Sequence, residues 1–94
     1  MSEILKRLQE AVILGEPDQA RELATQALEA GVAPLTAIEE GLNPGMQVVG
    51  DKFERGEFFI PDLMMAAEAM KAAMVVFEPV LMARREQRQV LDRK

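Results

Sequence analysis

The sequence predicts an all-α fold, an antiparallel four-helix up-down bundle whose third helix is kinked or broken near Pro44. Apolar residues recur at intervals of three and four along the chain, as on one face of a helix, and the alternation typical of strands does not occur. Short connections between the predicted helices place consecutive helices antiparallel to each other. The 94 residues, 49% of them apolar, suffice for one domain with one core.

The first two helices are predicted over residues 2–14 and 17–30. Ser2 can cap the first helix, and Pro17 suits the start of the second because its missing N–H needs no partner there. Gly31 is expected to end the second helix in a left-handed conformation. The predicted apolar faces are Ile4, Leu5, Leu8 and Val12 on the first helix, and Ala20, Leu23, Ala24, Ala27 and Leu28 on the second.

The third helix is predicted to run from Pro34 to about Gly56. Pro44 lies inside it, removes one backbone hydrogen bond and crowds the preceding turn, so a kink or short break is expected near Asn43. The apolar stripe keeps its phase across this point, so both halves should face the same core. With spacings of 3, 4, 4, 3 and 4, the stripe consists of Leu35, Ile38, Leu42, Met46, Val49 and Phe53.

The fourth helix is predicted to begin at Pro61, where Asp62 favours the positive end of the helix. Pro79 is expected to kink its end. Residues 1–82 then form one helical domain, and the charged residues 83–94 are predicted to be a tail or the start of a linker. The predicted core-facing positions, at alternating spacings of 4 and 3, are Leu63, Ala67, Met70, Met74, Phe77 and Leu81.

Charge and composition exclude several classes of function. Eleven basic and sixteen acidic residues give a net charge of -5, which disfavours nucleic acid and an anionic membrane surface as partners. The chain contains no Cys and no His, and therefore lacks a thiolate and the commonest general base and metal ligand. We expect no catalytic residue and no metal site. No apolar run approaches the ~20 residues of a membrane span, and the expected location is the cytoplasm.

The connection between the third and fourth helices is unusually apolar, since it contains Phe58, Phe59 and Ile60. Loops are normally polar because they lie on the surface. Two interpretations follow from these residues alone. They plug the end of the domain's own core, or they form a surface that covers a ligand or a partner.

Other residues near this loop are assigned structural roles. Gly50 is expected to allow close helix packing. The carboxylates Glu54, Glu57 and Asp62 are expected to form a solvated rim. Core filling by flexible side chains is expected for Met64, Met65, Met70, Met74 and Met82.

Two segments carry a family resemblance: Pro44 to Phe53 (PGMQVVGDKF) and Gly56 to Lys71 (GEFFIPDLMMAAEAMK). They resemble the helical N-terminal cap module of corrinoid (cobalamin-binding) methyltransferase proteins. That module occurs in the methylamine, methanol and aryl-ether corrinoid proteins and in cobalamin-dependent methionine synthase. The resemblance extends over about Ile4 to Leu81 and is stronger to the small corrinoid proteins than to methionine synthase.

The resemblance implies a function as a cap. In that family the bundle covers the upper face of the corrin and shields the methyl group on cobalt. The family's contact residues fall on Phe53, Ile60 and Leu63, which are therefore the expected cofactor-binding residues. An apolar lid keeps water away from a reactive cobalt centre. The resemblance implies a non-catalytic domain of a methyl-carrier protein, with cobalamin as the cofactor of the full-length protein and none expected on this fragment alone.

The sequence also departs from the family pattern. Family members continue into an α/β cobalamin-binding domain with an Asp-x-His-x-x-Gly motif, and this chain has no His. We expect an excised domain rather than a cap that acts in trans. The implied partners are the absent α/β domain and donor- and acceptor-specific methyltransferases, with a homodimer through the apolar end of the cap as a further expectation. The alternative function is a cofactor-free helical dimerisation or adaptor module.

Overall fold

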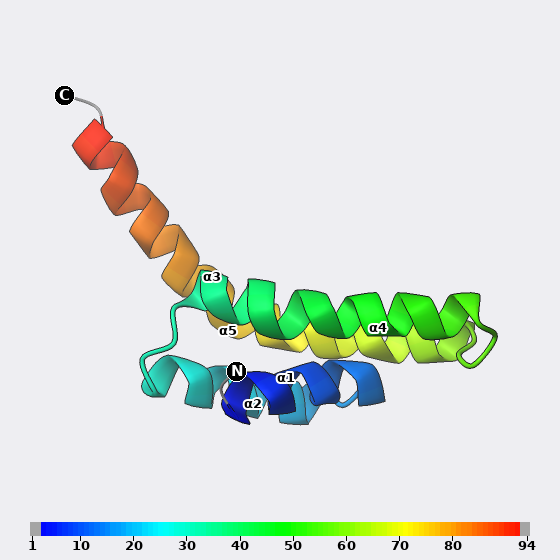
Figure 1. Cartoon of the computed structure of the whole chain (residues 1–94). Coiled ribbons are helices and arrows are strands. Elements are labelled where there is room, and N and C mark those ends of the chain that lie inside the picture. Colours follow the sequence, from blue (N-terminus) through cyan, green and yellow to red (C-terminus); the bar gives the residue numbers. More distant parts are fainter. Residues whose placement is uncertain (1–2, 93–94) are drawn as a thin grey trace.

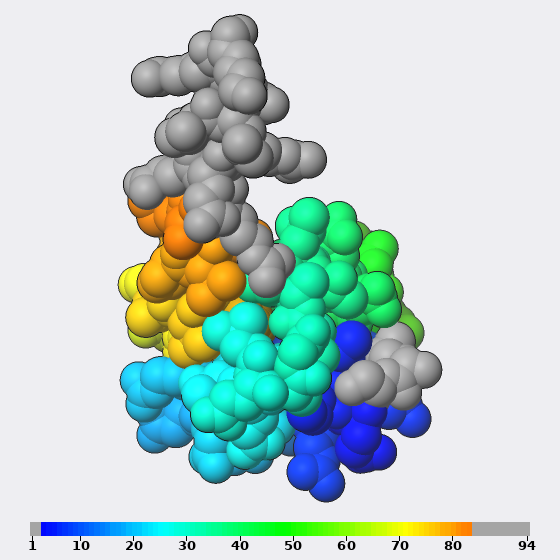
Figure 2. All heavy atoms as spheres, turned by 90° about the vertical axis from the view of Figure 1, so that its left-hand side faces the viewer, coloured from blue at the N-terminus to red at the C-terminus, as the bar shows by residue number. Residues whose placement is uncertain are grey.

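The computed structural model describes residues 3–92, with the side chains of residues 3–83. The described chain is entirely helical and forms four rods, as predicted. These are α1 (Glu3–Leu14), α2 (Pro17–Glu29), a continuous rod of α3 (Pro34–Ala37), η1 (Ile38–Leu42) and α4 (Asn43–Glu54), and α5 (Ile60–Asp92). Ser2, the expected cap of α1, lies outside the described residues. Figure 1 shows α1 and α2 as one layer and the antiparallel α4 and α5 as the other, and Figure 2 shows the same layers end-on.

The core lies between the two layers and is rich in alanine. The contact of α2 with α5 is the most extensive between any two elements. Small side chains on both helices let them approach closely. The buried apolar residues are Leu5, Leu8, Ala11, Val12, Ala20, Leu23, Ala24, Ala27, Ala37, Leu42, Val49, Ala66, Ala69, Ala73 and Phe77.

The core-facing side of α5 differs in part from the predicted one. Ala67 is exposed, whereas Ala66, Ala69 and Ala73 are buried. Met70 and Met74 lie at the margin of this face and pack partly buried against the core. Close approach of α2 selects the smallest side chains for the centre of the face, and the larger ones move to its edges. Leu35, expected on the stripe of the third helix, is also exposed.

Pro44 is accommodated by a π turn and not by an interruption of the rod. The N–H of Asn43 donates to the carbonyl of Ile38, five residues earlier, and this defines η1. A proline has no N–H and its ring collides with the carbonyl four residues earlier in a regular α-helix. The wider turn before Pro44 relieves this crowding. The predicted irregularity near Asn43 is therefore present, while the helical rod continues into α4.

The turn between α1 and α2 is pressed against α5. Gly15 has φ 67°, and the N–H groups of Gly15 and Glu16 donate to the carbonyls of Val12 and Ala11 at 3.1 and 2.9 Å. A Cβ built on Gly15 would lie 2.6 Å from the Cβ of Met65. The α4–α5 connection extends beyond this turn, past the ends of α1 and α2 (Figure 1).

Beyond the bundle, α5 continues as helix to Asp92 and contains Pro79. Figure 1 shows α5 changing direction in its orange part, as expected for a helix with an internal proline. The predicted charged tail, residues 83–94, is thus helical over its described part, and residues 93–94 lie outside the described residues. Its assignment as a linker remains a prediction.

Candidate functional site

The overhanging end of the α4–α5 hairpin carries most of the exposed aromatic and aliphatic residues that the sequence singles out. We call this end, residues 52–64, the tip. Its side chains Phe53, Phe59, Ile60 and Met64 are 41%, 65%, 58% and 63% exposed. Phe58 and Leu63 are partly buried and pack against the core. The tip is exposed because α1 and α2 end before they reach it (Figure 1).

The backbone of the tip is held by a closed turn at the end of α4. Gly56 adopts φ 78°, a left-handed conformation that favours glycine. Its N–H donates to the carbonyl of Phe53 at 3.1 Å. The carbonyl of Lys52 accepts the N–H groups of Glu57 and Phe58 at 2.8 and 3.1 Å. These bonds satisfy carbonyls that the end of a helix would otherwise leave open.

Side chains reinforce the same turn. The Lys52 ammonium lies 3.3 Å from a carboxylate oxygen of Glu57 and 5.5 Å from the centre of the Phe58 ring. Arg55 Nε lies 2.9 Å from the other carboxylate oxygen of Glu57. Glu57 therefore joins two cations of the turn, and its side chain remains 50% exposed, in keeping with the expected solvated rim.

The start of α5 is also fixed by a reciprocal pair of hydrogen bonds. The N–H of Phe59 donates to Oδ2 of Asp62 at 2.9 Å, and the N–H of Asp62 donates to the carbonyl of Phe59 at 3.0 Å. This is the backbone arrangement of a capping box, in which a carboxylate reaches back to the cap residue. The helix begins at Ile60, one residue before the predicted Pro61. The backbones of Phe59 and Ile60 are ordered while their side chains are exposed.

The predicted cofactor-facing residues divide into two kinds. Phe53 and Ile60 are exposed and available to a ligand, whereas Leu63 is partly buried against the core. The plug interpretation thus fits Leu63 and Phe58, and the covering interpretation fits Phe53, Ile60 and Phe59.

Sequence reasoning missed Met64 as a member of this surface. Met64 follows Ile60 by four residues and therefore lies on the same side of α5, which is the signal that could have found it. Core filling is wrong for Met64, Met65 and Met82, which are exposed. Close packing is also wrong for Gly50, where an added Cβ would meet no atom within 4 Å.

The exposed aromatic and aliphatic side chains of the tip carry no ionisable group. Among the described residues, no group of three or more Asp or Glu side chains is placed to hold a metal ion. No buried side-chain nitrogen or oxygen in the described part of the chain lacks a hydrogen-bond partner. None of the described helices has the length and apolarity needed to cross a membrane. The exposed aromatic and aliphatic side chains of the tip suit contact with an apolar face.

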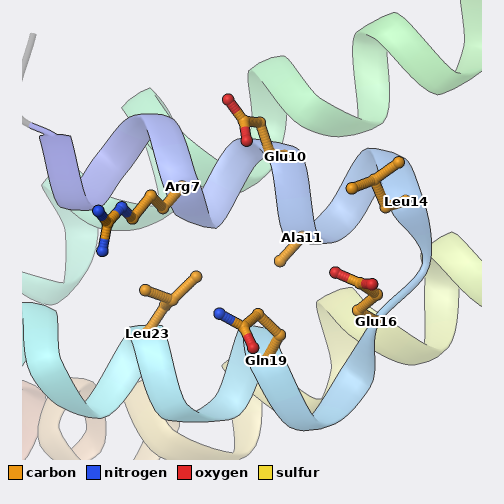
Figure 3. Close-up of a pocket in the computed structure, with 7 residues that line it drawn as sticks. All are labelled: Arg7, Glu10, Ala11, Leu14, Glu16, Gln19 and Leu23. Carbon is orange, nitrogen blue, oxygen red and sulfur yellow. The ribbon is translucent and has the colours of Figure 1, made fainter.

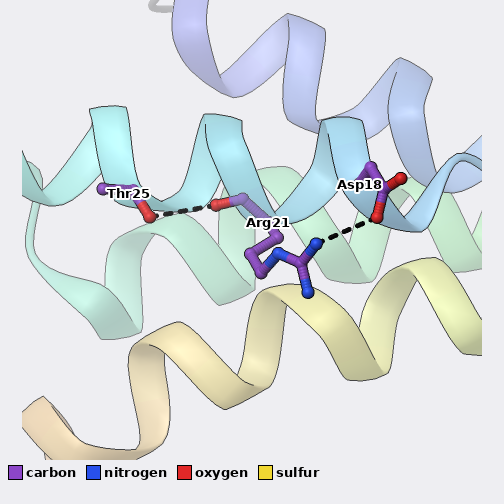
Figure 4. A network of polar contacts seen from close by, with 3 residues as sticks. All are labelled: Asp18, Arg21 and Thr25. Carbon is purple, nitrogen blue, oxygen red and sulfur yellow. Dashed lines mark hydrogen bonds and ion pairs between the residues drawn. The ribbon is translucent and has the colours of Figure 1, made fainter.

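A second concavity lies between α1 and α2, on their side away from α4 and α5 (Figure 3). It is an open groove lined by Arg7, Glu10, Ala11, Leu14, Glu16, Gln19 and Leu23. Nearby on α2, Arg21 donates to Asp18 at 2.9 Å, and the Thr25 hydroxyl donates to the Arg21 carbonyl at 3.1 Å (Figure 4). These contacts are exposed and local to one helix, and charges of both signs line the groove. No binding chemistry follows from them.

Comparison with known proteins identifies the family of the chain. Residues 4–78 match the family model described as B12 binding domain. The chain belongs to this B12 binding domain family. This B12 binding domain is 47% identical over 79 residues to monomethylamine corrinoid protein 1 of Methanosarcina acetivorans, covering 84% of the chain and 36% of that protein. It is 41% identical over 83 residues to trimethylamine corrinoid protein 2 of the same organism, covering 88% of the chain and 38% of that protein.

Solved structures show the same fold for the B12 binding domain. The monomethylamine corrinoid protein of Methanosarcina barkeri aligns with a TM-score of 0.82 and 44% identity, covering 84% of this chain and 37% of that chain. A chain of the methanol:cobalamin methyltransferase complex of Methanosarcina barkeri aligns with a TM-score of 0.76 and 32% identity, covering 83% of this chain and 30% of that chain. The resemblance to corrinoid proteins is thus confirmed. The chain spans little more than a third of the length of the relatives described here.

Proposed function

We propose that this B12 binding domain is the helical cap of a corrinoid methyl-carrier protein and covers the upper face of the methylcobalt with its tip. The observation that carries the proposal is the exposure of Phe53, Ile60 and Met64 at an end that no other part of the described domain covers. Similarity to the monomethylamine and trimethylamine corrinoid proteins supports it.

Burial of the tip against a corrin would be favourable. Apolar surface removed from water contributes roughly 25 cal/mol per Å². Phe53, Phe59 and Ile60 are 41%, 65% and 58% exposed, so covering them would add to the affinity between cap and cofactor. Leu63 packs against the core and anchors this surface to the bundle.

The residues of the tip would act by excluding water. When bound, the corrinoid supplies the cobalt that carries the methyl group. The exposed aromatic and aliphatic side chains of the tip would provide the cover, while the carboxylates of Glu57 and Asp62 serve the turn and the helix cap. A dry, apolar cover prevents side reactions with solvent. In this proposal the domain itself is not a catalyst.

The proposed partners follow from the cap role. The cap would close over a cobalamin-binding α/β domain elsewhere in the full-length protein. Donor- and acceptor-specific methyltransferases would each need the cap to move aside to reach the methyl group. Similarity to a chain of a methanol:cobalamin methyltransferase complex supports partners of this class.

The test uses the full-length protein loaded with methylcobalamin. Phe53→Ala and Ile60→Ala should each speed photolysis of the methyl–cobalt bond, because they thin the cover. Leu35→Ala is the matched control, since Leu35 is 55% exposed but lies in α3, at the opposite end of the rod from the tip. Unaltered photolysis and unaltered absorption spectra in both tip variants would favour the cofactor-free adaptor module instead.

A further inference from the structure

Lys52 contacts the turn of the tip through both its backbone carbonyl and its side chain. Its carbonyl accepts two N–H groups, those of Glu57 and Phe58. Its ammonium lies 3.3 Å from Glu57 and 5.5 Å from the centre of the Phe58 ring. The side chain is 29% exposed, so it is partly withdrawn from water and its pairing is screened less than that of a free surface lysine.

These contacts join the two halves of the exposed surface. Lys52 directly precedes Phe53 on α4, while Glu57 and Phe58 directly precede Phe59 and Ile60 on the other side of the turn. The tip extends past α1 and α2 (Figure 1), and only Phe58 and Leu63 of its apolar residues pack against the core. The turn therefore contributes to the relative placement of the exposed Phe53 and Ile60.

We infer that Lys52 is a positioning residue of the cap, which holds the α4–α5 turn so that Phe53 and the Phe59–Ile60 pair present one preformed apolar surface. The effect of Lys52 on cofactor binding rests on the proposed function, whereas its role in holding the α4–α5 turn does not. A preformed surface binds more tightly because the ordering cost is met before binding. The Lys52 ammonium contacts the turn and acts through the residues on either side of it.

The chemistry of the two side-chain contacts predicts which replacements succeed. Arginine at this position keeps the positive charge, and a guanidinium can both pair with a carboxylate and stack on an aromatic ring. Methionine keeps an unbranched apolar chain but loses the charge. Lys71 offers a matched control on α5, because its ammonium pairs with Glu68 at 3.8 Å at an exposed site outside the tip.

The first measurement is amide hydrogen exchange in the 94-residue chain. Lys52→Met should speed exchange of the Glu57 and Phe58 amides by about threefold to tenfold, the range expected for loss of a modest ion pair and a cation–π contact. Lys52→Arg should restore the slow exchange, and Lys71→Met should leave these amides unchanged. Unchanged exchange in Lys52→Met, with the same melting temperature as wild type, would overturn the inference.

The second measurement is photolysis of methylcobalamin held by the full-length protein. Lys52→Met should speed it in the same direction as Phe53→Ala, and Lys52→Arg should not. An effect of Phe53→Ala without any effect of Lys52→Met would overturn the positioning role while leaving the cap proposal intact. No effect of Phe53→Ala would sink the cap proposal, and the exchange data would still decide whether Lys52 holds the turn.

Discussion

Gly15, in the turn between α1 and α2, lies directly against Met65 of α5. A Cβ atom added to Gly15 would lie 2.6 Å from the Cβ atom of Met65. Real Cβ atoms essentially never lie this close, so the α1–α2 turn or α5 would have to shift to accept a side chain at position 15. This contact marks the level at which the two-layer bundle ends and the tip begins.

Gly15→Ala should therefore destabilise the domain strongly. It combines a left-handed backbone, φ 67°, with overpacking against α5, and we expect a loss of about 2–4 kcal/mol. Gly56→Ala is the control, because Gly56 has φ 78° but no atom within 4 Å of its added Cβ. It should cost only about 1 kcal/mol of backbone strain. Urea unfolding of both variants measures the difference, and equal losses would contradict the packing argument.

Two phenylalanines should differ sharply in their contribution to stability. Phe77 is fully buried at the centre of α5, so Phe77→Ala should cost about 3–5 kcal/mol. Phe53 is 41% exposed at the tip, and Phe53→Ala should lower the free energy of unfolding by much less than Phe77→Ala does. Since a domain of this size is stable by only about 5–15 kcal/mol, Phe77→Ala should lower the melting temperature markedly. A large loss for Phe53→Ala would show that it is a core residue and not a cover.

The isolated chain should self-associate through its tip. An exposed apolar surface tends to find a partner, and in this fragment the partner available is a second copy. Sedimentation at increasing concentration should show a dimer that Ile60→Asp weakens. Leu35→Asp, a charge placed at another exposed leucine, should leave association unchanged. A strict monomer at high concentration, unaffected by Ile60→Asp, would count against this expectation.

The isolated chain should not bind methylcobalamin appreciably. The tip supplies one apolar face, and the described residues include no group of three or more Asp or Glu side chains placed to hold a metal ion. Calorimetry at micromolar concentrations should show no binding heat, with the full-length protein as the positive control. Tight binding by the fragment alone would mean that the cofactor site is more complete than the tip indicates.

Much of this structure follows from the sequence, and the exceptions have physical causes. Periodic apolar positions and the turn residues Gly15, Gly31 and Gly56 predict the helices, and Phe58 to Ile60 predict an unusual apolar turn. The buried face of α5 was misplaced at Ala67, since alanines occur on several sides of the helix and carry little periodic signal. Which residues of α5 are buried depends on how closely α2 approaches, and the sequence of α5 alone does not determine that distance.

The exposure of Met64 illustrates a different limit. Methionine on an amphipathic helix usually fills a core, yet Met64 lies beyond the reach of α1 and α2. The 12 residues of α1 extend about 18 Å at 1.5 Å per residue, clearly less than the rod from Pro34 to Glu54. Helix lengths could have revealed the overhang, whereas the periodicity of α5 considered alone could not.

The π turn at Ile38–Leu42 has a consequence for the face that α4 turns to the core. A π turn contains one residue more than an α turn, and this extra residue is taken up locally by the wider turn. Ala37 before the turn and Val49 after it are therefore both buried in the same core. Deleting one residue from the segment would return it to an α turn with little rotation of α4, but the ring of Pro44 would then collide with the carbonyl four residues earlier. Deleting a residue from the regular part of α4 would instead turn Phe53 by about 100° around the helix axis.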